Sequence, residues 1–198
     1  MPRRMIGVPG RGGGTAVIGG FVAFLAAVGY LIASSVAKRT VVVFEPTPVG
    51  RARLDRSDGL ADTVTIDAGD AKGWRFFDVD RGSVIAPPDT SGWDLAFRRF
   101  HIRAAGAVAD GGQVSFAHVA NAPLEEFQSG WVGRDSSNAA IRRWYNYSML
   151  THLLEPNGHV YVVRTREGRH VKLEVLSYYC QGLTPGCVTF RYEKIREP

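Results

Sequence analysis

The sequence predicts a mostly β fold, in which one transmembrane α-helix precedes a compact antiparallel β domain with short helices. Two observations lead to this fold class. An uncharged apolar run lies near the N-terminus, and the rest of the chain alternates apolar and polar residues in short segments separated by turn-forming residues. An unbroken apolar run is typical of a membrane-spanning helix, whereas alternation with a period of two is typical of half-buried strands.

The N-terminal segment divides into a glycine- and arginine-rich arm at residues 1–14, expected in the cytoplasm, and a transmembrane helix at residues 15–37. The helix segment has 23 uncharged residues, about 34 Å at ~1.5 Å per residue, and a bilayer core needs about 20 residues. A cleaved signal peptide is the alternative, because Ser35-Val36-Ala37 resembles a cleavage site. The run is longer than the apolar region of a usual signal peptide, so we expect a retained anchor.

Small residues form a stripe along this helix. Gly19, Ala23 and Ala27 follow one another at four-residue spacing, and Tyr30 lies beside them. Such a stripe lets another helix or a flat pigment pack closely, although any single-span anchor contains some Gly and Ala. The expected partners are therefore the lipid bilayer and a membrane protein complex.

Residues 38–60 read as a linker and residues 61–198 as the β domain. The expected strands are 62–68, two short strands within 73–85 on either side of Asp80-Arg81-Gly82, the longest candidate at 93–105, and 111–120. Short helices are expected at 123–128 and from Ser136 or Ser137.

The last fifty residues carry the clearest strand pattern. Strands at 159–165 and 169–180 flank the turn signal Arg166-Glu167-Gly168. A final strand at 187–195 follows a second turn. The apolar side chains that should share the buried face are Val171, Leu173 and Val175 in one strand and Val188, Phe190 and Tyr192 in the other.

Cys180 and Cys187 are the two cysteines, and six residues lie between them. We expect a disulfide formed in an oxidising compartment, which would contribute about 2.5 kcal/mol in the chain-entropy model. Two reduced thiols are the alternative; no second Cys/His pair has the spacing of a zinc site. Basic residues flank the apolar helix on both sides, so we orient the protein by its cysteines and its signal-like start. They predict a single-pass protein of a bacterial inner membrane, with a cytoplasmic N-terminus and a periplasmic β domain.

The charge distribution argues against nucleic acid as a partner. The formal net charge is +5, but residues 1–37 carry three arginines and no acid, which leaves 21 basic and 19 acidic residues in the remainder. A surface that neutralises phosphates needs a larger excess. No hydrolase, zinc-protease or phosphate-loop motif occurs, so we expect no enzymatic activity. Asp78 and Asp80 read as a surface pair that Arg75 or Arg81 could neutralise.

Four blocks of sequence stand out by their order and spacing: "GWRFFDVDRGSVI", "SGWDLAFRRFHIR", "WYNYSMLTHLLEPNGHVYVVRTREGRHVKLEVLSYY" and "GCVTFRY". Together they resemble the HmuY family of bacterial haem-binding proteins, and the resemblance covers roughly residues 60–195. It implies an exported, nearly all-β domain and haem held between two axial side chains on projecting loops. The chain departs from the family in having a spanning helix where its members have a signal or a lipid-anchored cysteine. The family's axial ligands lie in variable loops and cannot be carried over to matching positions.

Haem is the candidate cofactor, although the sequence requires none. Axial haem ligands are His, Met, Cys or Tyr, and the candidates here are His101, His118, His152, His159, His170 and Met149. Sequence context places three of these histidines on polar strand faces or in a turn, and it assigns Met149 to the core. His118 and His152 remain as the candidate haem ligands.

The block "SGWDLAFRRFHIR" reads as structural. Trp93, Leu95 and Phe97 should share one face, and Asp94 should tether a neighbouring turn or pair with an arginine such as Arg98.

The sequence favours a non-catalytic, single-span subunit whose periplasmic domain stabilises a larger membrane complex, such as a photosynthetic or respiratory electron-transfer assembly. The alternative is a membrane-anchored haem-binding protein for haem capture or delivery.

Overall fold

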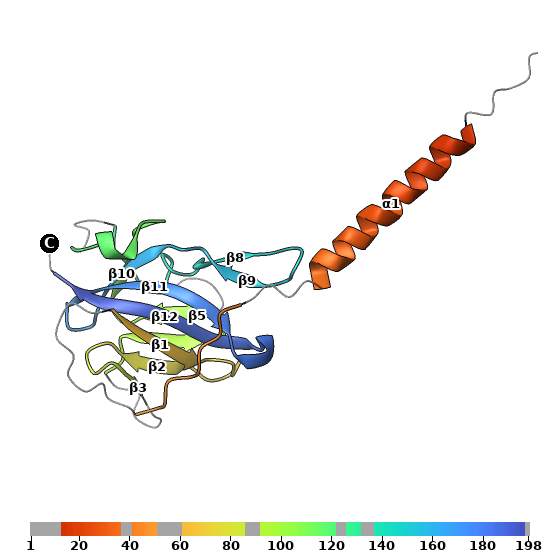
Figure 1. Ribbon diagram of the computed structural model, residues 1–198. Helices are drawn as coiled ribbons and strands as arrows, with labels where there is room; N and C mark the ends of the chain where they lie inside the picture. Colours follow the sequence, from red (N-terminus) through yellow and green to blue (C-terminus); the bar gives the residue numbers. More distant parts are fainter. Residues whose placement is uncertain are drawn as a thin grey trace, which may run out of the picture. The chain divides into compact units, whose positions relative to one another are not determined.

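The computed structural model describes residues 13–36, 41–50, 61–85, 92–121, 126–131 and 137–196. The chain divides into two compact units, one containing the N-terminal helix and residues Ser148–His152, the other containing the β domain. The predicted arm at 1–14 and linker at 38–60 fall mostly outside the described residues. The fold is mostly antiparallel β with a single N-terminal helix, as the sequence predicts (Figure 1).

Helix α1 spans Gly13–Val36. Its segment Val17–Ser34 is long and apolar enough to cross a membrane, with a mean hydropathy of 2.2, and none of this segment is buried. Gly19, Ala23, Ala27 and Tyr30 are all exposed on this helix. Their role in packing against another helix stays a prediction.

The β domain contains two larger sheets and a small hairpin. Six strands form an antiparallel sheet in the order β1-β12-β11-β10-β6-β7, and four form a second sheet in the order β3-β2-β4-β5. The bounds of the first set are Asp62–Asp67 (β1), Pro185–Ile195 (β12), His170–Tyr179 (β11), Val160–Arg164 (β10), Ala107–Asp110 (β6) and Gln128–Ser129 (β7). Those of the second are Ser83–Ile85 (β3), Arg75–Asp78 (β2), Leu95–Arg98 (β4) and His101–Ala104 (β5). The separate hairpin pairs β8, Tyr145–Tyr147, with β9, Leu154–Pro156.

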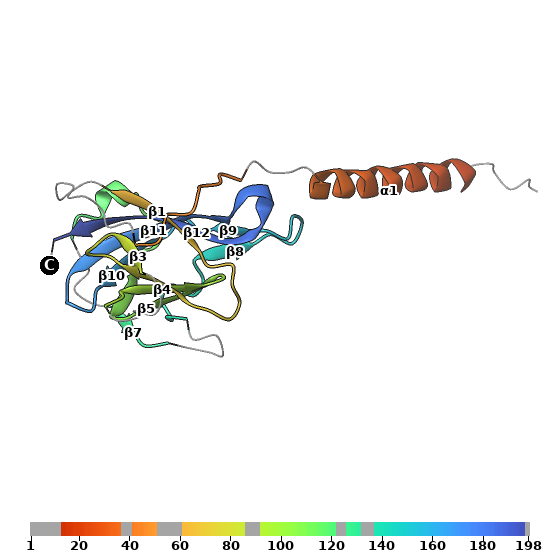
Figure 2. The same ribbon diagram turned by 90° about the horizontal axis from the view of Figure 1, so that it is seen from below.

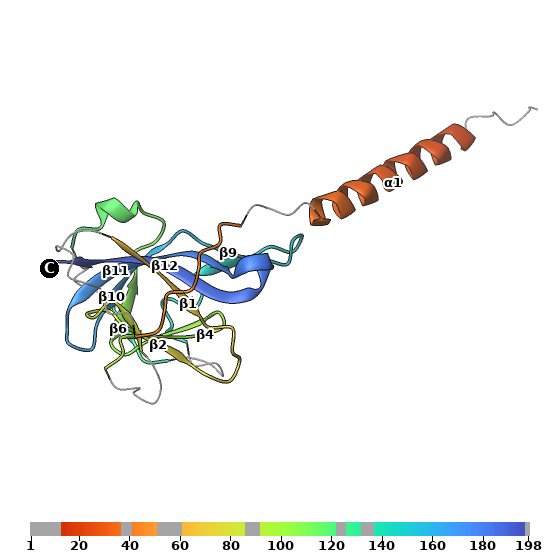
Figure 3. The same ribbon diagram turned by 60° about the horizontal axis from the view of Figure 1, so that its bottom comes forward.

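The hydrophobic core lies between the two larger sheets (Figure 3). The ring of Phe77 on β2 lies edge-on to Phe190 on β12, with the ring centres 5.4 Å apart. Phe97 on β4 stacks on the same Phe190 at 5.3 Å. The predicted apolar faces of β11 and β12 are buried in this core, which confirms the alternation seen in their sequence. Aromatic side chains therefore provide much of the contact between the sheets.

Segment 93–105 was wrongly predicted as one strand, because the structure folds it into the β4–β5 hairpin. Arg98 pairs with His101, and Arg99 turns the chain with a φ of 51°. A non-glycine residue in this left-handed conformation gives no turn signal in the sequence. Leu95 and Phe97 are buried as expected, whereas Trp93 is half-buried and packs on Phe76.

Three further local predictions are wrong at least in part. Segment 111–120 forms a loop that contains the short 3-10 helix η1, Phe116–His118, instead of a strand. In the segment 123–128, expected to be a helix, residues 123–125 lie outside the described part, and its last residue, Gln128, begins strand β7 instead. The helix expected from Ser136 or Ser137 is a turn in its described residues, where Ser137 forms an isolated bridge position.

Cys180 and Cys187 are joined by a disulfide across the loop between β11 and β12, with their Cα atoms 4.9 Å apart. The loop contains the 3-10 helix η2, Gln181–Leu183. Figure 2 shows this loop and the β8–β9 hairpin at the same end of the β domain.

Candidate functional site

A pocket of about 800 Å³ lies beside the paired start of β11 and end of β12. Its walls come from three segments: Ala117, Ala120 and Asn121 after β6, then Arg169, His170 and Lys172, and then residues 193–196. This volume lies within the range of about 300–1,000 Å³ that is usual for small-molecule sites.

Strand register explains why these residues meet. His170 pairs with Ile195, and Lys172 pairs with Glu193, so the two strands present alternate side chains to the same side. An isolated parallel bridge between Asn121 and Arg196 holds the loop that contains η1 next to the end of β12. Residues from two distant parts of the chain therefore form one wall.

Positive charge dominates the pocket. Its lining contains the cations Arg169, Lys172, Lys194 and Arg196, against a single acid, Glu193. Lys172 is almost fully buried; its Nζ lies 3.1 Å from Glu193 and 4.6 Å from the centre of the Phe116 ring. Such an excess of cations suits an anionic ligand.

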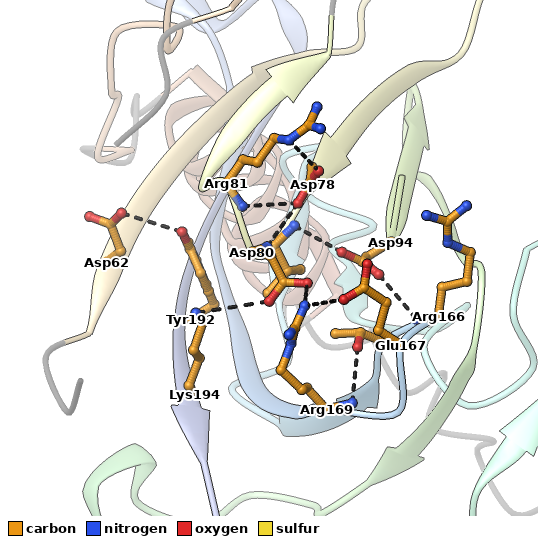
Figure 4. Close-up of polar contacts among 12 residues, drawn as sticks. Asp62, Asp78, Asp80, Arg81, Asp94, Arg166, Glu167, Arg169, Tyr192 and Lys194 are labelled. Carbon is orange, nitrogen blue, oxygen red and sulfur yellow. Dashed lines mark hydrogen bonds and ion pairs between the residues drawn. The ribbon is translucent and has the colours of Figure 1, made fainter. Parts of the chain in front are cut away.

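Acids outside the pocket orient two of these cations (Figure 4). Arg169 donates hydrogen bonds to Asp80 and Glu167, and the Asp80 carboxylate raises the pKa of the Arg169 guanidinium. The Nζ of Lys194 lies 3.8 Å from the same Asp80 carboxylate. Asp80 thus partly neutralises the charges of Arg169 and Lys194, and the pairing of Lys194 with Val171 puts its side chain on the face of the sheet opposite to that of Lys172.

The remaining acids of this region stabilise turns. Carboxylate oxygens of Asp78, Asp80 and Asp94 all lie within 4.8 Å of one another. Asp78 accepts hydrogen bonds from the backbone N–H groups of Asp80 and Arg81, and its other oxygen lies 3.5 Å from Nε of Arg81. Arg75 donates its Nε–H to the carbonyl of Asp67, so of the two arginines proposed as partners Arg81 pairs with Asp78.

The two sequence-predicted haem ligands occupy different loops. His118 ends η1 and lies exposed between the pocket residues Ala117 and Ala120, while His152 lies exposed in the β8–β9 loop with a φ of 56°. The described pocket lining includes neither imidazole. Their role as a ligand pair stays a prediction.

His170 is a haem-ligand candidate that the sequence pattern set aside but that lines the pocket. The pattern assigned it to a solvated strand face, yet its side chain lines the pocket and its ring lies 5.5 Å from that of Phe127. The signal was present in the sequence, since cations stand next to it at Arg169 and two residues on at Lys172. What the sequence did not reveal was the β12 partner strand, which adds more cations.

The other candidates lie elsewhere. Nδ1 of His101 is 3.1 Å from the hydroxyl of Ser137, and Nδ1 of His159 is 2.9 Å from the Asp110 carboxylate. Met149 was predicted to fill the core, but 75% of it is exposed. That prediction is wrong because the β8–β9 hairpin carries Met149 out of the core.

Comparisons with known proteins give the same fold. An apo HmuY analogue from Tannerella forsythia is 16% identical, with a TM-score of 0.60 over 69% of this chain and 96% of that one. A candidate lipoprotein from Bacteroides fragilis is 20% identical, with a TM-score of 0.59 over 73% and 94%. A candidate HmuY-like haem-binding protein from Bacteroides vulgatus is 21% identical, with a TM-score of 0.57 over 67% and 90%. No curated protein matches the sequence.

The family comparison agrees with the sequence blocks. The model of the HmuY protein family matches residues 70–192, which is more than half of the chain and includes the strands of the two larger sheets except β1 and the last three residues of β12. The match also includes Arg169, His170 and Lys172 of the pocket. The chain therefore belongs to the HmuY family.

Proposed function

We propose that the protein binds haem at a membrane surface, with the cationic pocket beside β11 and β12 as its binding site. The observation that carries this proposal is a pocket of about 800 Å³ that combines four cations with the imidazole of His170, in a domain of the HmuY family. The similar Bacteroides vulgatus structure is itself described as a candidate haem-binding protein. The main functional interpretation of the sequence, a subunit of a photosynthetic or respiratory complex, receives no support from these comparisons.

The residues present fit haem in three respects. The two propionates of haem are carboxylates, and Arg196 offers a guanidinium group to them. Ala117, Ala120 and Ile195 give the pocket apolar surface for a flat macrocycle. When bound, haem would supply an iron centre that accepts an imidazole nitrogen, and His170, or His118 next to the pocket residue Ala117, would hold it.

Membrane attachment is the second part of the proposal. Helix α1 has the length and apolar character of a single membrane span, and the Bacteroides fragilis neighbour is a candidate lipoprotein. The Cys180–Cys187 disulfide fits an oxidising compartment. We place the N-terminus in the cytoplasm and the β domain in the periplasm of a bacterial inner membrane. No catalytic step is part of the proposal, because haem capture or delivery requires only binding and release.

Haem titration of the full-length protein in mild detergent tests the proposed site. We expect a Soret band that saturates at micromolar haem and an affinity at least tenfold lower in His170→Ala or His118→Ala. His159→Ala is the matched control, because His159 pairs with Asp110 outside the pocket lining. His152→Ala tests the sequence-predicted ligand in the same assay.

A comparison of haem with its dimethyl ester tests whether the pocket recognises the propionate charges. The ester lacks these charges, so it should bind to the wild type more weakly than haem does. Replacing Arg196 by Gln should weaken the binding of haem more than the binding of the ester. Absence of any spectral change at micromolar haem would refute the proposed function. Wild-type affinity in His170→Ala, His118→Ala and Arg196→Gln alike would refute the site.

A further inference from the structure

The loop of the β8–β9 hairpin exposes large apolar side chains. The exposed fractions are 50% for Tyr147, 75% for Met149 and 56% for Leu150. The segment 145–154 contains no Asp, Glu, Lys or Arg. Exposed single apolar residues are common, but a charge-free loop tip with adjacent Met and Leu indicates a surface that something apolar covers.

The base of this hairpin lies next to the place where the N-terminal segment enters the β domain. Val41 packs on the core, and the carbonyl of Val42 accepts a hydrogen bond of 2.7 Å from the hydroxyl of Ser177 on β11. Two residues further along β11, the hydroxyl of Tyr179 accepts a hydrogen bond of 2.7 Å from the N–H of Leu154 on β9. Chain entry and hairpin base therefore share one end of β11.

The chain length before this entry point limits how far that end can lie from a membrane. Helix α1 ends at Val36, so four residues separate it from Val41. A fully extended chain over this distance spans at most about 18 Å. The end of the domain that carries the apolar loop is thus held near whatever surface receives α1.

We infer that Met149 and Leu150 insert into the interfacial region of the lipid bilayer that holds α1, and that this inference rests on the proposed membrane attachment. Burying their exposed apolar surface in acyl chains is favourable by the hydrophobic effect. Tyr147 and Tyr145 lie at the hairpin's first strand, and tyrosine is a residue type enriched at membrane–water interfaces. The contact makes a second attachment of the protein to the bilayer, in addition to α1.

An environment-sensitive dye tests the contact in the full-length protein. Met149→Cys, labelled with the fluorophore NBD and reconstituted into vesicles of phosphatidylcholine and phosphatidylglycerol, should emit several-fold more strongly and at shorter wavelength than in detergent-free denaturant. Arg166→Cys is the matched control: Arg166 is also exposed, but it lies in the turn that precedes β11, at the opposite end of that strand. Its label should emit as in water. Adding Leu150→Asp to Met149→Cys should shift the emission towards that of the control.

Vesicle flotation and haem titration of the same labelled proteins separate the possible failures. If the protein does not float with the vesicles, membrane attachment fails and this inference fails with it. If it floats but the Met149→Cys label emits as in water, the lipid contact alone is overturned. If the Met149→Cys label is shielded from water in native membranes but not in pure lipid vesicles, the loop contacts a protein partner, and the inferred lipid contact is again overturned. Haem binding is read from the Soret band and does not depend on any of these outcomes.

Discussion

The carboxylate of Asp94 accepts a hydrogen bond of 3.1 Å from the backbone N–H of Arg166, a residue 72 positions later in the chain (Figure 4). Its other oxygen accepts a hydrogen bond of 3.0 Å from the N–H of Val79. Asp94 precedes β4 of the four-stranded sheet, and Arg166 lies in the β10–β11 turn of the six-stranded sheet. One buried carboxylate therefore fixes a turn of each sheet, which confirms the prediction that Asp94 tethers a neighbouring turn.

Replacing Asp94 by Ala should destabilise the domain by about 2–4 kcal/mol, because the buried N–H of Val79 and the part-buried N–H of Arg166 lose their acceptor. Asp94→Asn keeps one acceptor oxygen and should lose about half as much. Chemical denaturation followed by tryptophan fluorescence measures both free energies of unfolding. Asp70→Ala is a control at an exposed acid whose hydrogen bond to Lys72 is local. Equal stabilities of the Asp94→Ala and Asp70→Ala variants would contradict the tether.

The pH dependence of the Asp94 contribution follows from its burial. Desolvation raises the pKa of the Asp94 carboxyl above its ordinary value of 3.8, against the lowering effect of its two backbone hydrogen bonds. The folded state then holds this proton more tightly than the unfolded chain. Its contribution to stability is full below about pH 3.8 and is lost as the pH rises through the folded-state pKa. The stability deficit of Asp94→Asn should accordingly be larger at pH 3.5 than at pH 7, and a deficit that grows towards pH 7 would contradict this sign.

Sequence patterns predicted the fold correctly where local pattern and long-range packing agree. Val171, Leu173 and Val175 alternate with polar residues and are all buried, and the turn at Gly168 has the left-handed φ of 87° that glycine favours. The β4–β5 hairpin was not predicted, because its turn residue Arg99 also has a positive φ, and an arginine in a sequence does not indicate a turn. In that hairpin, tertiary contacts override the residue's own preference.

The candidate site was less predictable than the fold, since it depends on strand register. Lys172 and Glu193 read as ordinary polar positions of two strands until the β11–β12 register places them opposite each other. The bridge from Asn121 to Arg196 joins segments 75 positions apart and follows a loop that the sequence suggested was a strand. The family resemblance supplied the fold, while the pocket and the place of His170 depend on how distant segments pack in three dimensions.

Tyr161 should ionise only in strongly alkaline solution. Burial raises the pKa of its phenol from 10.0 to about 12, although the Asn157 side chain, which donates a hydrogen bond of 3.0 Å to the phenol oxygen, acts in the opposite direction. The contribution of the Tyr161 phenol to the stability of the fold is therefore full below pH 10 and is lost as the pH rises to about 12. Absorbance at 295 nm should show a titration step near pH 12 that Tyr161→Phe lacks. If Tyr161→Phe instead loses a titration step near pH 10, the Tyr161 phenol is not desolvated.

Gly106 allows two strands to approach closely. A Cβ atom at this position would lie 2.1 Å from the carbonyl oxygen of Arg164 and 2.9 Å from that of Thr165, and neither backbone atom can rotate away. Gly106→Ala should cost about 3 kcal/mol, the upper end of overpacking effects, because β6 must move from β10. Gly112→Ala is the control: its φ is 74° but nothing lies within 4 Å, so only about 1–2 kcal/mol of backbone strain is expected. Thermal denaturation ranks the two, and an equal or smaller loss for Gly106→Ala would contradict the close approach.

Variants of the Lys172–Glu193 ion pair should affect the stability of the fold and the binding of haem in different ways. Lys172 is 3% exposed, so Glu193→Gln leaves a buried ammonium without its counter-charge and should cost about 2–4 kcal/mol. The double variant Lys172→Met/Glu193→Gln removes both charges, keeps the long apolar stem against Phe116, and should recover most of that stability. It leaves the net charge of the pocket lining at +3, whereas Glu193→Gln alone raises that charge to +4. Haem affinity should therefore rise in the less stable single variant and return to the wild-type value in the double variant. Urea denaturation and haem titration of the same samples measure the two effects. Haem affinity that follows stability across these variants would show that the pocket's charge does not recognise the ligand, since only the fold would then matter.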